Sequence, residues 1–247
     1  PICLAERLSI APSRILLSCD HNHSVPNVTH PQRYDYETRE RPAPDPQYLT
    51  EVGRDLLENL FRAAETLREK AQPAWVYFGT AEERRVAYNR KGQWPDGSHY
   101  FIREQERLEL GEDYTGTIDP AADVVTFESA TGDPLLVLTR YTAHPVTAYH
   151  PERMMAFGDW PAMACDRLRE AMGLPDLPIA FLQGCAGNVN SRYFLSGDIE
   201  RSRELGDFLG DSFVRAWKER TEVHPTGFQF RNLPVSIPFA SLPSPEA

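Results

Sequence analysis

A His-x-His sequence follows directly on a short apolar run near the start of the chain. Residues 19 to 27 read Cys-Asp-His-Asn-His-Ser-Val-Pro-Asn, and Ile15, Leu16 and Leu17 precede them. Because residues two apart in an extended segment point to the same side, His21 and His23 can face one target. Neutral imidazole is the commonest protein ligand for metals. The adjacent Asp20 offers a third ligand, through a carboxylate oxygen, or a carboxylate that orients a histidine. Two ordinary surface histidines would give the same pattern.

Two further apolar runs also end in polar residues. The run from Leu135 to Tyr141 leads to His144-Pro145, and the run from Ile179 to Leu182 leads to Gly-Cys-Ala-Gly-Asn-Val-Asn-Ser at 184–191. In α/β sheets, ligand sites form in the crevice beyond the carboxyl ends of the strands. The three strand ends are therefore predicted to meet in one site.

His144, the 184–191 loop and Arg90 each have a catalytic and a purely structural interpretation. His144 is either a second metal ligand, because zinc sites draw ligands from separate elements, or an ordinary histidine at a strand end. The 184–191 loop either lets a substrate approach backbone donors or is a tight turn. Arg90 either stabilises an anionic intermediate or lies on the surface. Asp159 is most simply a carboxylate favoured at a helix start.

The pattern of apolar residues predicts an α/β fold, a mixed β-sheet layered with helices. Apolar residues at helical spacing predict amphipathic helices, a Gly-containing turn predicts a β-hairpin, and the fully apolar 179–182 run predicts a central strand covered on both faces. The expected elements are a strand at 15–17, a helix at 47–70, strands at 75–78 and 85–88, a long loop at 91–118, a hairpin of 124–127 with 135–141, helices at 161–172 and 199–218, and alternating residues at 228–239.

Composition narrows the function classes. The chain has 247 residues, 41% of them hydrophobic, and a formal net charge of -10. This charge disfavours nucleic acid and anionic membrane surfaces as partners, which leaves a small-molecule or lipid substrate. No apolar stretch approaches the roughly 20 residues of a transmembrane helix. The four cysteines, Cys3, Cys19, Cys165 and Cys185, show no close-spaced zinc pattern and permit but do not require disulfides.

The order of these motifs resembles the neutral ceramidase family, the neutral/alkaline non-lysosomal ceramidases and their bacterial relatives. His21-Asn22-His23-Ser24-Val25-Pro26 is similar to the family's His-Thr-His-Ser-Gly-Pro motif, and Asn89-Arg90 to its Asn-Arg element. Thr117-Ile118-Asp119-Pro120, the hairpin and Tyr141-Thr142-Ala143-His144-Pro145 resemble its Asp-Pro, Gly-Pro hairpin and Ala-x-His-Pro block. Asp159 matches an aspartate before a helix, and Gly187-Asn188-Val189-Asn190 resembles the Gly-Asp-Val-Ser-Pro loop.

The resemblance implies a zinc-dependent amidase that cleaves an N-acyl bond, as in sphingolipid metabolism. By this analogy His21 and His144 are Zn²⁺ ligands, His23 assists proton transfer and Arg90 contacts the carbonyl or oxyanion. Bound zinc would polarise the scissile carbonyl and lower the pKa of its water. Relatives of this type are often exported, so the resemblance also implies a secreted or periplasmic location.

The chain departs from the family pattern at several positions. Asn190 occupies the place of the family's serine nucleophile, and Ser191 is one position away, so both are catalytic candidates and attack by metal-activated water is preferred. Asn188 replaces an aspartate and Val25 a glycine. The family's remaining ligands, a Glu and a Tyr, have no counterpart here, so residues 1–247 are expected to form one catalytic domain truncated at both ends.

Two other functions stay open at this point. The substitution at Asn190 and the missing ligands favour a non-catalytic scaffold or binding module of the same fold. An esterase or amidase acting on a substrate other than a sphingolipid is the third possibility.

Overall fold

The computed structural model describes residues 2–29, 49–153, 155–224, 226–227, 233 and 235–236. The chain divides into two compact units, residues 1–17 with 225–247, and residues 18–224. In the first unit the described elements are helix α1 (Ile2–Leu8) and the 3-10 turn η1 (Pro12–Arg14). All the other elements belong to the second unit. The single domain expected over residues 1–247 stays a prediction.

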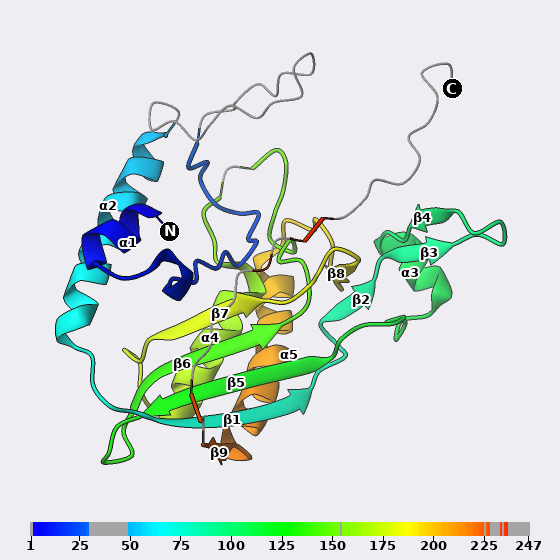
Figure 1. Cartoon of the computed structure of the whole chain (residues 1–247). Helices are drawn as coiled ribbons and strands as arrows, with labels where there is room; N and C mark the ends of the chain where they lie inside the picture. Colours follow the sequence, from blue (N-terminus) through cyan, green and yellow to red (C-terminus); the bar gives the residue numbers. More distant parts are fainter. Residues whose placement is uncertain are drawn as a thin grey trace. The chain divides into compact units, whose positions relative to one another are not determined.

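A five-stranded mixed sheet forms the centre of the second unit (Figure 1). Its order is β7-β6-β5-β1-β9, with β6 and β7 parallel and the other neighbours antiparallel. The predicted hairpin is confirmed, because β5 pairs with β6 through a turn that contains Gly132 at φ 86°. The strands are β1 (Trp75–Glu82), β5 (Ala121–Glu128), β6 (Pro134–Tyr141), β7 (Ile179–Gln183) and β9 (Thr221–Val223).

Two helices pack together on one face of this sheet (Figure 1). They are α4 (Asp159–Met172), which connects the parallel strands β6 and β7, and α5 (Ile199–Lys218). Alternate residues of β5 and β6 are buried, as expected for a sheet with one covered face. The core between helices and sheet includes Val86, Val124, Val137, Tyr141, Trp160, Leu168, Leu205, Leu209 and Phe213.

The helices predicted at 161–172 and 199–218 are confirmed, and their ends follow ordinary capping chemistry. The Asp198 side chain accepts hydrogen bonds from the backbone N–H groups of Glu200 and Arg201 at the start of α5. Gly173 ends α4 in the left-handed conformation, with φ 69°. Helix α5 approaches β1 so closely that a Cβ at Gly79 would lie 1.9 Å from the Ala216 carbonyl oxygen.

Several small elements complete the second unit. Helix α2 (Glu51–Glu69) confirms the helix predicted at 47–70, and its apolar residues Val52, Leu56 and Leu60 are exposed. Strands β2 (Ala87–Asn89) and β8 (Val189–Ser191) form a two-stranded sheet. The second two-stranded sheet pairs β3 (Lys91–Gln93) with β4 (His99–Phe101), and helix α3 (Glu104–Leu110) follows it.

The long loop predicted at 91–118 is wrong over much of its length, because β3, β4 and α3 lie within it. A tight turn joins the two strands. The Asp96 carboxylate accepts hydrogen bonds from the Ser98 backbone N–H and hydroxyl, and Gly97 has φ 86°. An Asp-Gly pair is a strong hairpin signal, so the polar composition of this stretch concealed a short β-hairpin.

Three predicted strands also differ from the structure. The one predicted at 85–88 is β2 (Ala87–Asn89), which begins two residues later. The Ile15–Leu17 run is not a strand, and Leu16 and Leu17 are 78% and 47% exposed. The 179–182 run is a strand, but β7 lies at the edge of the sheet rather than at its centre and is only partly buried. Apolar composition alone does not distinguish an edge from a central position. The alternation predicted at 228–239 lies almost wholly outside the described residues.

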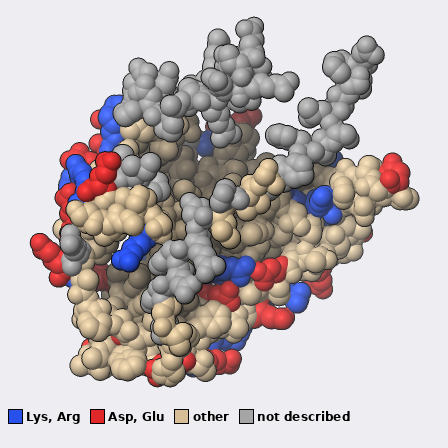
Figure 2. Space-filling model, in the orientation of Figure 1, with Lys and Arg blue, Asp and Glu red and all other residues tan. Residues whose placement is uncertain are grey.

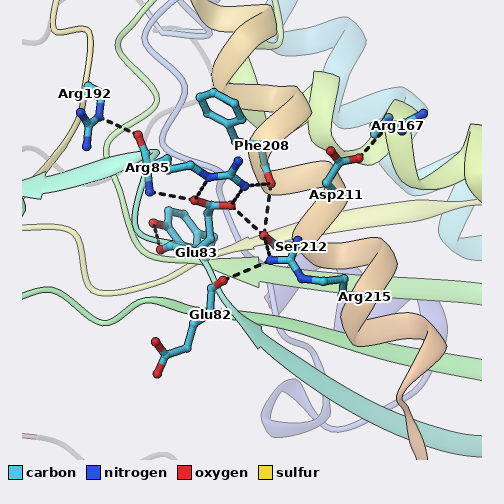
Figure 3. Close-up of polar contacts among 10 residues, drawn as sticks. Glu82, Glu83, Arg85, Arg167, Arg192, Phe208, Asp211, Ser212 and Arg215 are labelled. Atoms are coloured by element: carbon cyan, nitrogen blue, oxygen red, sulfur yellow. Dashed lines mark hydrogen bonds and ion pairs between the residues drawn. The ribbon is translucent and has the colours of Figure 1, made fainter. Parts of the chain in front are cut away.

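A buried carboxylate ties the sheet to α5 (Figure 3). Glu83 is 2% exposed, and its two carboxylate oxygens accept four hydrogen bonds. Three come from Arg85, and the fourth comes from the Ser212 hydroxyl on α5. The Glu83 backbone carbonyl accepts a further bond from the Tyr141 hydroxyl at the end of β6. This network anchors the strand end that leads toward His144.

The surface carries both signs of charge. On the face in Figure 2, acidic and basic side chains are interspersed between uncharged residues. Within the described part of the chain, none of the helices has the length and apolar character that crossing a membrane requires.

Candidate metal centre

Three histidines from two distant parts of the chain meet beyond the carboxyl end of β6. His21, His23 and His144 each offer a ring nitrogen, and these nitrogens lie within 4.8 Å of one another. The ring centroids of His21 and His144 are 4.6 Å apart, and those of His21 and His23 are 5.0 Å apart. Three converging imidazoles form a group that could hold a metal ion.

Local hydrogen bonds hold the loop that carries His21 and His23. His21 has φ 60°, in the left-handed region that non-glycine residues seldom adopt. The Asn22 side chain donates to the Phe157 carbonyl at 2.7 Å and accepts from the Ser24 backbone N–H at 2.8 Å. The His23 backbone N–H donates to the Pro145 carbonyl at 3.4 Å, which joins this loop to the residue after His144.

His144 is oriented by one carbonyl group. Its Nδ1 lies 3.0 Å from the Val189 carbonyl oxygen, which also accepts from the His144 backbone N–H at 3.1 Å. A carbonyl only accepts, so Nδ1 carries the proton and Nε2 keeps a free lone pair for a metal. The strand ends after β6 and β7 lie together as predicted, because the Gly184 backbone N–H donates to the Tyr141 carbonyl at 2.9 Å.

Arg90 is fixed to the loop after β7 at three points. Its backbone N–H donates to the Asn188 carbonyl at 2.8 Å. One guanidinium nitrogen donates to Asn190 Oδ1 and another to the Gly187 carbonyl, both at 3.0 Å. Asn190 is fully buried, and its amide nitrogen donates to the Tyr88 hydroxyl at 3.4 Å. Asn190 therefore positions Arg90.

The electrostatics around His23 and His144 favour neutral imidazoles. Burial lowers the pKa of His23, and the nearby His21 and Arg90 lower it further. Burial also lowers the pKa of His144, partly opposed by its hydrogen bond to the Val189 carbonyl. The ordinary histidine pKa is about 6.5, so both rings are neutral at pH 7. Metals bind the neutral form of histidine.

A cavity of about 410 Å³ adjoins the cluster on the side of His23. This volume is within the usual range for small-molecule sites. Of the three histidines, only His23 is among the lining residues, and the ring of Tyr149 lies 5.9 Å from the His23 ring. The lining residues are His23, Ser24, Val25, Pro26, Asn27, Ala148, Tyr149, His150, Pro151, Arg153, Met155 and Ala156.

The structure places the other candidate residues around the cluster. Ser191 is fully buried, accepts a hydrogen bond from the Thr147 hydroxyl at 2.9 Å and donates to the Tyr193 carbonyl at 3.3 Å. Asp20 accepts a bond from the Asn22 backbone N–H and is not one of the residues that could hold the metal ion.

Asp159 is the helix-start carboxylate that the sequence indicates. It is fully buried, accepts from the Trp160 backbone N–H at 2.8 Å, and also accepts from the Ser202 hydroxyl and the Ala148 backbone N–H. Burial raises its pKa, against the effect of these hydrogen bonds. Asp159 thus supports the segment that follows His144.

Sequence reasoning missed the cavity residues after His144. Tyr149, His150 and Arg153 lie on an irregular segment with no apolar periodicity, and only their closeness in sequence to His144-Pro145 could have indicated them.

Comparisons with known proteins support the fold. No family model and no curated protein sequence matches the chain. A structure described as ceramidase complexed with C2 superposes with a TM-score of 0.59 at 17% identity, covering 88% of this chain and 33% of that one. Neutral ceramidase from Pseudomonas aeruginosa gives a TM-score of 0.52 at 18% identity, covering 68% of this chain and 26% of that one. The chain has a ceramidase-like fold and spans about a third of the first structure's length.

Proposed function

We propose that this chain carries part of the active site of a zinc-dependent hydrolase that cleaves an amide bond. The observation that carries the proposal is the convergence of His21, His23 and His144 beside Arg90 and a cavity of small-molecule size. The similarity to two ceramidase structures supports a hydrolase of this type.

The donor set suits zinc, which binds imidazole nitrogen in tetrahedral sites. We assign His21 and His144 as ligands, because the bond from His144 to Val189 leaves Nε2 free and His21 lies between the other two rings. His21 and His144 would hold the ion together with water, substrate or groups outside the described residues. When bound, zinc supplies Lewis acidity and makes attack by water feasible at neutral pH.

His23 and Arg90 have roles on the substrate side. His23 borders the cavity and has a lowered pKa, so its neutral ring can accept a proton at pH 7 and return it to the leaving amine. Arg90 presents a positive charge that Asn190 and the Gly187 carbonyl hold in place, suited to a developing oxyanion. The buried Ser191 supports the loop, and the attacking group is water rather than serine.

Zinc analysis of purified variants tests the metal assignment. His21→Ala combined with His144→Ala is expected to remove bound zinc. His23→Ala should retain zinc, and His99→Ala serves as a matched control because His99 is exposed on β4. Unchanged zinc in the double variant would refute the site, and loss of zinc in His23→Ala would make His23 a ligand.

Activity is tested with a panel of N-acyl sphingosine, short N-acyl amides and O-acyl esters. We expect amide cleavage that requires zinc and falls by about a hundredfold or more in His23→Ala, the usual scale for a lost proton-transfer group. Cleavage of esters alone would favour the esterase alternative. Zinc binding without turnover of any member would favour the non-catalytic module.

A further inference from the structure

The cavity beside His23 carries two polar side chains without partners. Ser24 is 4% exposed, and its hydroxyl makes no hydrogen bond within the described residues. Arg153 is exposed at the cavity, and its guanidinium has no ion pair or hydrogen bond to any described residue. The Ser24 hydroxyl oxygen is fully enclosed, so Arg153 is the unpaired group that a ligand in the cavity can reach.

The charge around the cavity is unusual for this acidic protein. The chain has a formal net charge of -10, yet none of the described residues that line the cavity is Asp or Glu. The polar residues that line it, besides Ser24 and Arg153, are His23, Asn27, Tyr149 and His150. These side chains offer hydrogen-bond donors, and Arg153 adds a positive charge. Such a lining favours an anionic group, since it places no negative charge against one.

We propose that this cavity binds a carboxylate of the substrate, with Arg153 as its ionic partner. The inference rests on the proposed hydrolase function and makes the substrate an N-acyl amino acid or a similar amide with a carboxylate near the scissile bond. Arginine suits this role, because its planar guanidinium matches the two oxygens of a carboxylate.

The geometry links recognition to the proposed chemistry. Ser24 directly follows His23, and both border the same cavity, so a substrate bound there lies next to the histidine cluster. Apolar residues, among them Val25, Pro26 and Met155, also line the cavity and can accept a short acyl or side chain.

Direct binding measurements test the proposal separately from catalysis. Calorimetry on the purified protein would compare N-butanoylglycine with N-butanoylglycinamide, which differ only in the carboxylate and its neutral amide replacement. We expect the carboxylate to bind about fivefold tighter, the scale of one partly exposed charge-assisted contact. In Arg153→Gln the two probes should bind equally well. The preference should persist in the control Arg62→Gln, because Arg62 is exposed on α2 and pairs with Glu58.

Ser24→Ala provides a second control that does not change charge. The Ser24 hydroxyl is enclosed and has no partner among the described residues, so its removal should leave the unfolding free energy unchanged or slightly raised and the carboxylate preference unchanged. Equal binding of the two probes to the unmodified protein, or an unchanged preference in Arg153→Gln, would overturn the proposal. Tighter binding of N-butanoylethanolamine phosphate than of the carboxylate would also overturn it.

These outcomes separate the two proposals. If no amide is hydrolysed but the carboxylate preference depends on Arg153, the hydrolase function fails and the binding site stands. If amides are hydrolysed with no preference for charge, the hydrolase function stands and the carboxylate site fails.

Discussion

Replacing Glu83 by glutamine should destabilise the fold in a way that depends on pH. The Glu83 carboxylate lies between β1 and β2 and accepts bonds from Arg85 and from Ser212 on α5 (Figure 3). Glutamine keeps one acceptor oxygen, which can still accept hydrogen bonds from the backbone N–H and the Nε–H of Arg85. Its amide nitrogen would face two donors, the second guanidinium nitrogen of Arg85 and the Ser212 hydroxyl.

The expected loss is about 3 kcal/mol at pH 7, from two lost hydrogen bonds to a charged group at roughly 1.5 kcal/mol each, the low end for such bonds because the Arg85 side chain is half exposed. Breaking a fully buried ion pair costs about 3–5 kcal/mol, but the Arg85 side chain is 50% exposed and water can solvate it after the change. For a chain of this size the loss corresponds to a decrease of roughly 5–10 °C in Tm.

The pH dependence has a definite sign. Burial alone would raise the pKa of Glu83, but the hydrogen bonds from Arg85 and Ser212 outweigh it, so the pKa lies below its usual range. A group with a lowered folded-state pKa stabilises fully above its unfolded pKa of about 4.3, and loses this effect as pH falls through the folded-state value. The gap between the unmodified protein and Glu83→Gln should therefore be constant near neutral pH and narrow below about pH 4.3.

Urea unfolding at several pH values measures this gap. Glu82→Gln is the matched control, because the neighbouring Glu82 side chain is 73% exposed and pairs with the exposed Arg84, so its loss should stay below about 0.5 kcal/mol. A loss below about 0.5 kcal/mol for Glu83→Gln at pH 7 would refute the reasoning, as would a gap that widens on acidification.

Three further changes probe the packing and the site. Ser191→Ala should lower the unfolding free energy by about 1–2 kcal/mol, because a buried hydroxyl loses two hydrogen bonds, while zinc content stays the same; loss of zinc would contradict a supporting role. Gly79→Ala should cost about 2 kcal/mol or more in urea unfolding, because its Cβ would meet the Ala216 carbonyl, whereas Gly187→Ala, with no atom within 4 Å, should change little. Asn22→Ala should weaken zinc binding about tenfold, because the side chain holds the histidine loop, and an unchanged zinc affinity would show that the loop needs no such support.

The elements predicted best from the sequence are those with a long repeating pattern. Helices α4 and α5 and the β5–β6 hairpin follow from apolar spacing and turn residues that act locally. The place of β7 at the sheet edge depends on which strands pair with it, and residues 179–182 carry no information about that. The Ile15–Leu17 run has the composition of a strand without the partner that would make it one.

The candidate site can be predicted in part. The prediction that His21 and His144 lie together holds, because their rings meet, but His21 follows an irregular segment, so the strand-end rule accounts for His144 alone. The same rule gives no reason to expect that Asn190 is fully buried and holds Arg90, because burial depends on packing against Tyr88. The cavity residues after His144 cannot be predicted from the sequence, because an irregular segment has no periodic pattern of apolar residues.

The parallel pairing of β6 with β7 has a consequence for the order in which the protein folds. His144 takes its orientation from the carbonyl of Val189, and the two residues are brought together only when the strands before them pair across the α4 crossover. Non-local parallel pairing is slow, because the entropy of closing the connecting chain must be lost before contacts compensate for it. If the histidine cluster holds a metal ion as proposed, high-affinity uptake during refolding should follow formation of the β5–β6 hairpin and report the pairing of β6 with β7.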